Sequence, residues 1–276
     1  MKSGFAEELV FLKLGGSLIT DKAREATARL EVIERLAGEI KGALEARPSL
    51  RLVLGHGSGS FGHFAGRRYG VREGVKGPEG WKGFAETAAA AARLNRIVTD
   101  VLLAKGVPVL SLQPSASLLC HDGSIVRWVW EPVKVALEKG LVPLVYGDVA
   151  LDEVRGTTIV STEELFCYLA ERMRPRRILL AGEVEGVFTS DPLKDPAARL
   201  VPKTTPAEVG KIQEFLSGSY GIDVTGGMAQ KVRLMLRLVQ KLPDITVLII
   251  SGQKPGNVRD ALLSLQPLRC TVISSI

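Results

Sequence analysis

The residues best suited to chemistry in this sequence lie in short glycine-rich segments next to hydroxyl and basic side chains. The densest segment is residues 55–63 (GHGSGSFGH), which follows an apolar run at residues 50–54. Closely spaced glycines let backbone N–H groups turn toward an anion without obstruction, and the serines and His63 add further donors. We therefore interpret this segment as a phosphate-binding loop.

The same loop partly matches the dinucleotide fingerprint G-x-G-x-x-G through Gly57, Gly59 and Gly62. That fingerprint requires a strand before the glycines, a helix after them and an acidic residue at the end of the next strand. Only the strand is predicted, because residues 63–80 are rich in glycine and charge and show neither a helical period nor a second strand. The pattern therefore disfavours dinucleotide binding.

Another glycine pair, Gly15-Gly16, ends the first predicted strand, with Lys13 before it, Ser17 directly after it and Lys22 a few residues later. A glycine pair at the carboxyl end of a strand permits close approach of a ligand's phosphates, and lysines neutralise their charge. Taken alone, this segment is equally consistent with a simple turn.

A third glycine pair, Gly226-Gly227, precedes a helical pattern that carries Lys231 one turn from its start. Free backbone N–H groups and the positive end of a helix dipole attract anions at such a position, and Lys231 adds a cation. An ordinary capped helix with a solvated lysine explains the same residues.

Carboxylates follow two other predicted strands. Glu183 comes after one of them, with Gly186 and Asp191 farther along, and Asp148 comes after another. The carboxyl ends of parallel strands form the ligand-binding edge of such sheets. There the carboxylates can hold a lysine or a metal, or they can lie in surface turns.

Signatures of other enzyme classes are missing from the sequence. It contains neither a G-x-x-x-x-G-K-[ST] phosphate loop nor a G-x-S-x-G nucleophile elbow. His56, His63 and His121 lack the spacing of metal ligands. We therefore disfavour a P-loop kinase and a hydrolase, and we predict no metal site built by the protein alone.

Composition limits the classes of partner. The chain has 276 residues, of which 46% are hydrophobic, and a formal net charge of +6 that suits anionic small molecules. Few aromatic residues accompany the basic ones, which disfavours nucleic acid, and no segment approaches the roughly 20 apolar residues of a membrane span. Three distant cysteines suggest no disulfide framework, so we expect a cytoplasmic protein.

Short apolar runs alternate with longer helical patterns, which indicates a mostly parallel sheet covered by helices on both faces. The predicted strands are residues 9–14, 51–54, 107–112, 141–146, 177–180, 246–250 and 270–274. The predicted helices are residues 25–46, 83–104, 131–138, 161–172, 206–216, 227–240 and 258–264.

Two local features refine this organisation. Residues 150–160 (ALDEVRGTTIV) predict a short antiparallel hairpin, and Ser161 with Glu164 predicts a capping box at the start of the following helix. A basic connector near residue 175 divides the chain into an N-terminal lobe, residues 1–175, and a C-terminal lobe, residues 176–276.

The order of these segments carries more information than any one of them. Along the chain come K-L-G-G-S, Lys22, the glycine loop, Y-G-D-V, G-E-V-E-G-V-F-T-S-D-P and D-V-T-G-G-M with Lys231. This order resembles the amino acid kinase superfamily over nearly the whole chain. Within that superfamily, the loop ending S-F-G-H together with D-V-T-G-G-M is similar to the isopentenyl phosphate kinase family.

The resemblance implies a three-layer αβα sandwich with a mainly parallel central sheet. It implies that the N-terminal lobe binds a phosphoryl acceptor and that the C-terminal lobe binds ATP with Mg²⁺. The implied reaction converts ATP and isopentenyl phosphate to ADP and isopentenyl diphosphate, and dimethylallyl phosphate is expected to fit as well. The resemblance also implies a homodimer.

The resemblance assigns roles to residues by position. The implied catalytic residues are Lys13, Lys22, His63 and Lys231. The implied ATP-binding residues are Lys13, Gly15, Gly16, Ser17, Ser58, Glu183, Gly186, Asp191, Gly226, Gly227 and Lys231. The implied acceptor-binding residues are Gly57, Ser58, Gly59, His63, Gly147 and Asp148.

The sequence departs from the family pattern in two places. Relatives usually have Asp where this chain has Glu183, and often Asp in place of Glu185, so a longer carboxylate must orient the lysines or lie elsewhere. The alanines at residues 88–92 replace bulkier residues, which is consistent with a roomier alkyl pocket or with a closely packed helix. A fosfomycin-kinase-like phosphonate kinase and a non-catalytic nucleotide-binding member of the superfamily stay as alternatives.

Overall fold

The computed structural model describes residues 9–190, 192, 194–210, 227–264 and 269–276. Its centre is a sheet whose strands run β10 (Lys203–Thr204), β12 (Cys270–Ile273), β11 (Thr246–Ser251), β9 (Arg177–Gly182), β1 (Leu9–Leu14), β2 (Arg51–His56), β6 (Val142–Tyr146) and β3 (Val109–Ser111). Every pairing in this sheet is parallel except that of β11 with β12. The expected mainly parallel sheet is confirmed.

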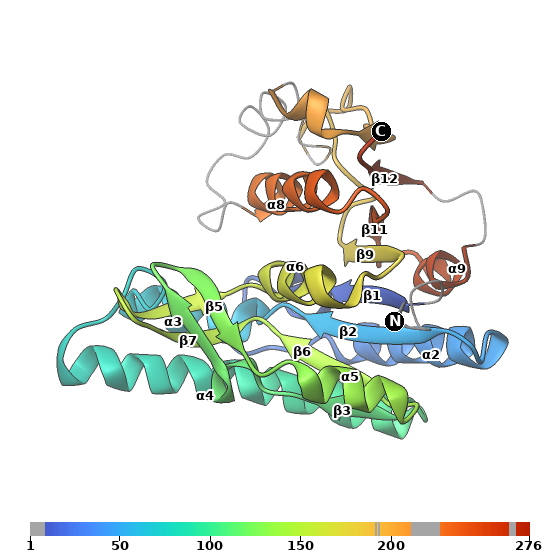
Figure 1. Ribbon diagram of the computed structural model, residues 1–276. Coiled ribbons are helices and arrows are strands. Elements are labelled where there is room, and N and C mark those ends of the chain that lie inside the picture. The colour runs from blue at the N-terminus through green and yellow to red at the C-terminus, as the bar shows by residue number, and fades with distance from the viewer. Residues whose placement is uncertain (1–8, 191, 193, 211–226, 265–268) are drawn as a thin grey trace.

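Helices cover both faces of this sheet (Figure 1). On one face pack α5 (Glu131–Glu138), α6 (Thr162–Met173) and α8 (Gly227–Lys241). On the other face pack α1 (Gly16–Ile19), α2 (Leu30–Ala46), α4 (Gly77–Ala104) and α9 (Asn257–Leu263). The molecule is therefore the expected three-layer αβα sandwich.

Alternation along β1 shows how the strand serves both layers. Leu9 and Phe11 belong to the core under α6 and α8, whereas Val10, Leu12 and Leu14 belong to the core under α2 and α4. Because successive strand side chains point to opposite faces, Lys13 lies on the same face as Phe11. The fold thus places a lysine between the sheet and α6.

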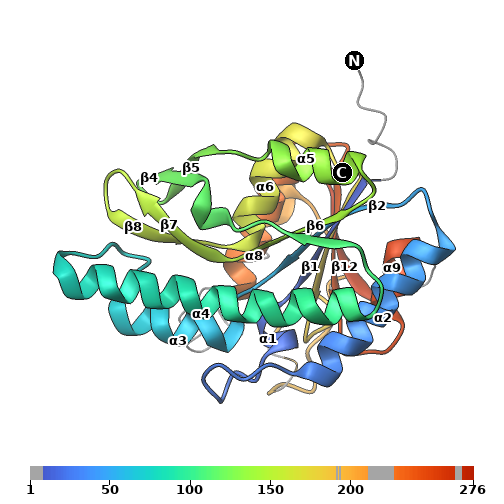
Figure 2. The ribbon, with the colours of Figure 1, turned by 90° about the horizontal axis from the view of Figure 1, so that it is seen from below.

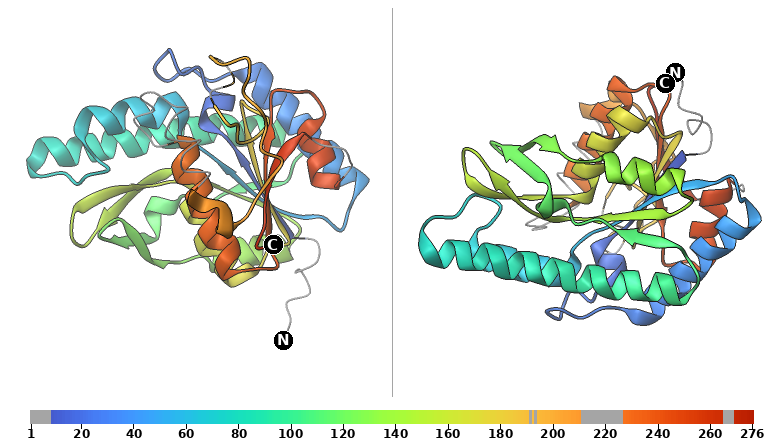
Figure 3. Two further views of the ribbon diagram at one scale, coloured as in Figure 1. Left: turned by 90° about the horizontal axis from the view of Figure 1, so that it is seen from above. Right: turned by 60° about the horizontal axis from the view of Figure 1, so that its bottom comes forward.

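A second, smaller sheet stands beside one end of the main sheet. Its order is β5 (Ser124–Trp128), β4 (Leu118–His121), β7 (Asp148–Asp152) and β8 (Gly156–Val160). The antiparallel pair β7–β8 confirms the predicted hairpin, whereas β4 and β5 were not predicted. Both views of Figure 3 show this sheet projecting from the same end of the molecule as α4.

One prediction about the glycine loop was wrong. A helix, α3 (Gly59–Tyr69), starts within the loop and lies alongside α4 (Figure 2). Its glycines lower its intrinsic helix propensity, but two of them allow close packing. A Cβ added to Gly62 would lie 2.6 Å from Oγ of Ser58, and one added to Gly66 would lie 2.8 Å from Ile159. Gly66 thus lets α3 pack closely against Ile159, a tertiary contact that the local sequence pattern does not predict.

The first long helix also begins later than expected. It starts at Leu30, not near residue 25, because residues 20–29 form a closed loop. The two ends of this loop are joined by a β-bridge between Thr20 and Ala28 and by a 2.8 Å hydrogen bond from the Arg29 N–H to the Ile19 carbonyl. We call residues 20–29 the Lys22 loop.

Helix α4 begins at Gly77, well before the predicted start at residue 83, whereas the other boundaries agree more closely with the predictions. The capping box of Ser161 and Glu164 is present at the start of α6. The predicted helix at residues 206–216 lies mostly outside the described residues, with a 3₁₀ turn, η2 (Pro206–Glu208), at its start. A further 3₁₀ turn, η1 (Pro114–Ala116), precedes β4. The lobe boundary predicted near residue 175 falls between α6 and β9, and the division into two lobes stays a prediction.

Candidate functional site

Parallel strands from both halves of the chain end together at one edge of the main sheet. In register, Leu14 of β1 is paired with His56 of β2 and Ala181 of β9. A glycine ends or directly follows each of five neighbouring strands, namely Gly15, Gly57, Gly147, Gly182 and Gly252 after β1, β2, β6, β9 and β11. This strand-end edge is where a parallel sheet binds its ligands.

Two of these glycine turns touch each other. A Cβ added to Gly16 would lie 2.6 Å from the Gly59 nitrogen, and one added to Gly57 would lie 2.8 Å from the Gly16 nitrogen. Any side chain at these positions would push the turns apart. The sequence therefore needs glycine here so that the backbones after β1 and β2 can meet.

The meeting of the turns gathers unused hydrogen-bond donors. Within the described part of the chain, the backbone N–H groups of Gly16, Ser17, Ser58 and Gly59 have no hydrogen-bond acceptor. Ser58 and Gly59 also stand at the start of α3, where the positive end of the helix dipole attracts anions. Since α3 is a helix, the predicted loop has a more favourable environment for phosphate than a loop alone.

The Lys13 ammonium forms a buried ion pair with Glu163 of α6. The two side chains are 11% and 7% exposed, and Nζ of Lys13 donates a short hydrogen bond to Oε2 of Glu163. Burial alone would raise the pKa of Glu163, but attraction from Lys13 and Lys231 and the Lys13 hydrogen bond hold this pKa below its ordinary value. The Glu163 carboxylate is therefore ionised, and the positive charge of Lys231 on α8 helps to keep it so.

The start of α6 determines where Glu163 lies. The Ser161 hydroxyl accepts a hydrogen bond from the Glu164 N–H at 3.2 Å, which caps the helix. The next side chain, Thr162, donates to the His56 carbonyl at 2.6 Å. These contacts fasten the first turn of α6 to the end of β2, so Glu163 faces the sheet where Lys13 emerges.

Buried contacts of the His56 ring hold the start of the phosphate-binding loop in place. The ring is buried and stacked on Tyr146, with ring centroids 5.5 Å apart. Burial lowers the pKa of His56, partly offset by its bonds to Gly57 and Asn95, so the ring is neutral near pH 7. Since the Gly57 carbonyl, 3.0 Å from Nδ1, can only accept, Nδ1 carries the proton and donates it.

The Lys22 ammonium lies in a different setting. Its side chain is 66% exposed, and Nζ lies 3.1 Å from Oε2 of Glu183, directly after β9. Nη1 of Arg29 lies 3.5 Å from the other oxygen, Oε1, of the same carboxylate. Glu183 thus contacts Lys22, and the buried Glu163 contacts Lys13.

A buried hydroxyl pair connects the Lys22 loop to the glycine turns. The Thr20 hydroxyl donates to the Gly16 carbonyl at 2.7 Å and accepts from the Ser60 N–H at 3.0 Å. The Ser60 hydroxyl accepts from the Thr27 N–H at 3.3 Å. Because Thr20 and Ser60 are both buried, the loop, the first glycine turn and α3 form one hydrogen-bonded unit.

His63 lies one turn into α3 from Gly59 and is exposed. Its ring makes an edge contact with Phe64, and the described residues offer it no hydrogen-bond or ion-pair partner. The structure therefore places a solvent-accessible imidazole on the helix whose first residues carry the unused donors.

The other predicted site residues occupy varied positions. Gly147 adjoins Ser58, whereas the buried Asp148 accepts hydrogen bonds from the N–H groups of Ser115 and Val149. Burial raises the pKa of Asp148, and these bonds offset the rise in part. Gly186 is buried against Thr271 of β12. Their proposed ligand contacts stay predictions.

Three other positions complete the predicted set. Gly227 begins α8, the helix that carries Lys231. Asp191 and Gly226 lie outside the described residues. Glu185, the second departure from the family pattern, pairs with Arg269 at 3.2 Å.

Sequence reasoning missed Glu163 and Arg29 as members of the site. Glu163 carried a usable signal, because it lies three and seven residues before Phe166 and Ala170 on the buried face of α6. An acidic residue on an apolar helix face requires a buried partner. Arg29 had no comparable signal, since its approach to Glu183 depends on closure of the Lys22 loop.

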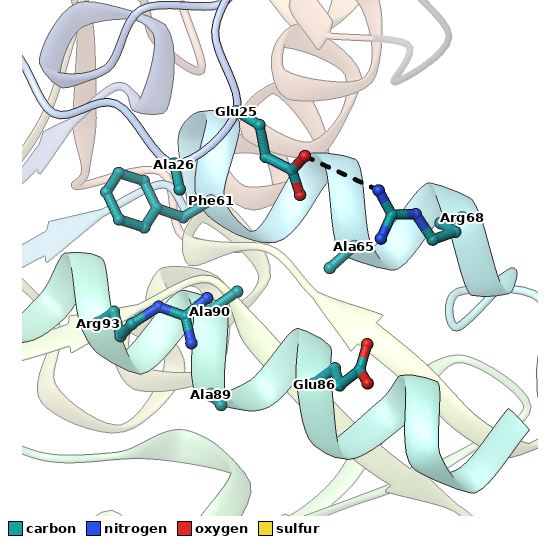
Figure 4. Close-up of a pocket in the computed structure, with 9 residues that line it drawn as sticks. All are labelled: Glu25, Ala26, Phe61, Ala65, Arg68, Glu86, Ala89, Ala90 and Arg93. Atoms are coloured by element: carbon teal, nitrogen blue, oxygen red, sulfur yellow. Dashed lines mark ion pairs between the residues drawn. The ribbon is translucent and has the colours of Figure 1, made fainter. Parts of the chain in front are cut away.

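A cavity of about 280 Å³ lies between α3 and α4 (Figure 4). Its lining comprises Glu25, Ala26, Phe61, Ala65, Arg68, Glu86, Ala89, Ala90 and Arg93. His63 is two residues from both Phe61 and Ala65, so it occupies a different face of α3. Ala88, by contrast, packs in a small apolar cluster with Val149 and Ile159. The run of alanines thus lines two separate regions.

The described residues contain no group of three histidine, cysteine or acidic residues that could hold a metal ion. No helix among them is long and apolar enough to cross a membrane.

The assembled geometry favours binding two anions side by side. Unused N–H groups lie where two glycine turns meet, and ammonium groups reach this edge from β1, the Lys22 loop and α8. Such a set neutralises and positions phosphates, which is the main task in phosphoryl transfer.

Comparisons with known proteins agree with this geometry. The model of the amino acid kinase family matches residues 8–251. The isopentenyl phosphate kinase of Methanothermobacter thermautotrophicus is 40% identical over 92% of this chain and 95% of its own length. That of Methanocaldococcus jannaschii is 33% identical, with the same coverage of 92% and 95%. A solved isopentenyl phosphate kinase structure is similar with a TM-score of 0.82 at 34% identity, covering 96% of this chain and all of the other.

Proposed function

This chain belongs to the amino acid kinase family and, within it, to the isopentenyl phosphate kinases, and we propose that it transfers the γ-phosphoryl group of ATP to isopentenyl phosphate. The products are ADP and isopentenyl diphosphate. The observation that carries this proposal is the contact between the turns at Gly16 and Gly57, which brings unused N–H groups from two strand ends together. The 40% identity to a curated isopentenyl phosphate kinase supports the choice of substrate.

The lysines and glycine turns perform most of the chemistry. Lys13, Lys22 and Lys231 neutralise the charge that repels the two phosphates and stabilise the transferred group in line between them. Gly15, Gly16 and Ser17 bind the ATP phosphates, with Gly186, Gly226 and Gly227 on the nucleotide side. The hydrogen bond to Glu163 fixes the position of the Lys13 ammonium, so the ammonium is oriented before the substrates arrive.

The acceptor phosphate binds at the start of α3. Ser58 and Gly59 donate backbone hydrogen bonds to it, and His63 adds a side-chain donor one turn farther along. The Gly57 N–H is bonded to the Leu14 carbonyl, so Gly57 contributes by letting the two turns meet. Because a phosphate monoester is already ionised near pH 7, the reaction needs no general base to create a nucleophile. As a donor to the acceptor phosphate, His63 favours a phosphate acceptor over a carboxylate.

Mg²⁺ bound with ATP would supply positive charge to the phosphates of the nucleotide. The described residues offer no dedicated cage, and Glu183 is already engaged by Lys22 and Arg29. Phosphate and water oxygens would therefore supply most of its ligands.

Further parts of the proposal come from the family. Dimethylallyl phosphate, which differs from isopentenyl phosphate only in its double bond, is a second substrate. The N-terminal lobe, residues 1–175, binds the acceptor, and the C-terminal lobe, residues 176–276, binds ATP. The protein acts as a homodimer in the cytoplasm.

An acceptor panel tests the function. Consumption of ATP is measured with isopentenyl phosphate, dimethylallyl phosphate, fosfomycin and no acceptor, and the product is identified by mass. We expect rapid turnover with both prenyl phosphates and only background consumption otherwise. Preference for fosfomycin would replace the proposal with a phosphonate kinase, and ATP binding without turnover on any acceptor would indicate a non-catalytic protein.

A further inference from the structure

Glu183 is shared between two cations that differ in how firmly they are held. Lys22 approaches Oε2 and Arg29 approaches Oε1, so each cation has its own oxygen. Lys22 is 66% exposed, whereas the Arg29 side chain is 33% exposed. The Arg29 backbone is also fixed on both sides, because its N–H donates to Ile19 and its carbonyl accepts from Ile33 at the start of α2.

This arrangement matters because Lys22 has two competing partners. In the proposed function its ammonium must reach the transferred phosphoryl group, yet the nearest anion in the structure is Glu183. A carboxylate with Lys22 as its only partner would retain the ammonium. If the lysine left, the unpaired carboxylate would repel the incoming phosphates. Arg29 removes this conflict, since it keeps Glu183 neutralised when Lys22 moves away.

We propose that Arg29 is a positioning residue that shares the Glu183 carboxylate and so releases Lys22 for the phosphates. The inference rests on the proposed function for the destination of Lys22 but not for the contacts themselves. It also gives the longer Glu183 side chain a role, as a bridge between two cations on the Lys22 loop.

A double-mutant cycle tests this role. Arg29→Gln leaves Glu183 with Lys22 alone, so kcat with isopentenyl phosphate should fall about fivefold, the scale of one exposed ion pair. Glu183→Gln in the same chain removes the competing carboxylate, so the double variant should recover to about the activity of Glu183→Gln alone. Arg29→Lys keeps the positive charge, so its kcat should be close to that of the unaltered protein.

A second readout works without any turnover. The rate at which an amine-reactive reagent acylates Lys22, measured by mass spectrometry, reports how freely the ammonium leaves Glu183. We expect slower acylation in Arg29→Gln and faster acylation in Arg29→Gln/Glu183→Gln. Arg24→Gln is the matched control, because Arg24 lies on the same loop, is exposed and pairs with Asp21 at 3.8 Å.

The outcomes separate the two proposals. If the unaltered protein does not phosphorylate isopentenyl phosphate, the proposed function fails, while the acylation rates still decide the role of Arg29. If Arg29→Gln leaves the acylation of Lys22 unchanged, or if Glu183→Gln does not restore what Arg29→Gln removes, Arg29 only supports the loop and the inference is overturned.

Discussion

The site contains two lysine–glutamate pairs whose surroundings differ sharply. Lys13 and Glu163 are 11% and 7% exposed and lie between the sheet and α6, whereas Lys22 and Glu183 are 66% and 32% exposed at the molecular surface. The charge of Lys231 on α8 also acts on the carboxylate of the first pair, and Arg29 of the Lys22 loop contacts the carboxylate of the second. We refer to them as the buried pair and the exposed pair.

The difference indicates two duties for the same chemistry. A buried ion pair is costly to break, so it holds its lysine in one orientation. An exposed pair contributes little to stability and lets its lysine exchange partners. The buried pair therefore sets the geometry of the site, and the exposed pair supplies a cation that follows the phosphates.

Lys13→Met should give the largest effect on both measures. Turnover with isopentenyl phosphate should fall by about a thousandfold, because one preorganised donor is lost. The free energy of unfolding should fall by about 3 kcal/mol, because Glu163 is left buried and unpaired. Steady-state kinetics and urea unfolding measure the two. Unchanged stability would show that other groups in the folded protein stabilise the Glu163 carboxylate when Lys13 is removed.

Lys22→Met should separate activity from stability. We expect turnover to fall by about a hundredfold, the effect of one lost charge contact at the transferred group. The free energy of unfolding should change by less than about 1 kcal/mol, since the exposed pair is weak. A stability loss as large as that of Lys13→Met would remove the distinction between the two pairs.

His63→Ala tests whether the exposed His63 side chain selects the acceptor. Turnover with isopentenyl phosphate should fall roughly ten- to a hundredfold, because the acceptor phosphate loses a donor. Binding of ATP, measured by calorimetry without acceptor, should stay close to that of the unaltered protein. Unchanged acceptor kinetics would rule out this role for His63.

The pH dependence of stability should reflect the titration of the buried His56. In the unfolded chain His56 takes up a proton near pH 6.5, but burial lowers its pKa in the folded protein. Between the two pKa values the unfolded state binds more protons, so stability should fall as the pH drops from 7.5 to 5.5. The pKa of Glu163 is also lowered, but its contribution is lost only below about pH 4.5.

Urea unfolding at several pH values checks this expectation. His56→Gln, which cannot titrate, should show a flatter profile between pH 7.5 and 5.5 than the unaltered protein. Equal slopes in the two proteins would mean that groups other than His56 cause the acid sensitivity.

Substitutions in the alanine run should give the smallest effects. The alanine run is consistent with a roomy alkyl pocket, and Ala88 packs beside Val149 near the start of β7. A leucine there should narrow such a pocket. Ala88→Leu should therefore lower kcat/KM for isopentenyl phosphate by about threefold, and for the longer geranyl phosphate by more. Ala89→Leu is the matched control, since Ala89 lines the cavity on the other face of α4. A larger effect from Ala89→Leu would place the alkyl tail in that cavity.

Much of the framework was predictable from the sequence. The strands at residues 9–14 and 51–54, the helix at 131–138 and the capping box at Ser161 each depend on local patterns of apolar and polar residues. Helix α3 was missed because its glycines lower local propensity, and its close packing against Thr87 of α4 and Ile159 depends on tertiary structure. The positions of Asp191 and Gly226 lie outside the described residues.

Local sequence patterns were enough to predict which residues stand at the strand ends and that glycine and lysine are the phosphate-binding residue types there. These features follow from short-range periodicity and from backbone sterics at glycine, which act within a few residues. Tertiary structure alone decided that Lys13 pairs with Glu163, 150 positions away, and that Lys22 and Arg29 share Glu183. Such pairings depend on sheet order and on closure of the Lys22 loop, because electrostatic contact requires proximity in space and not in sequence.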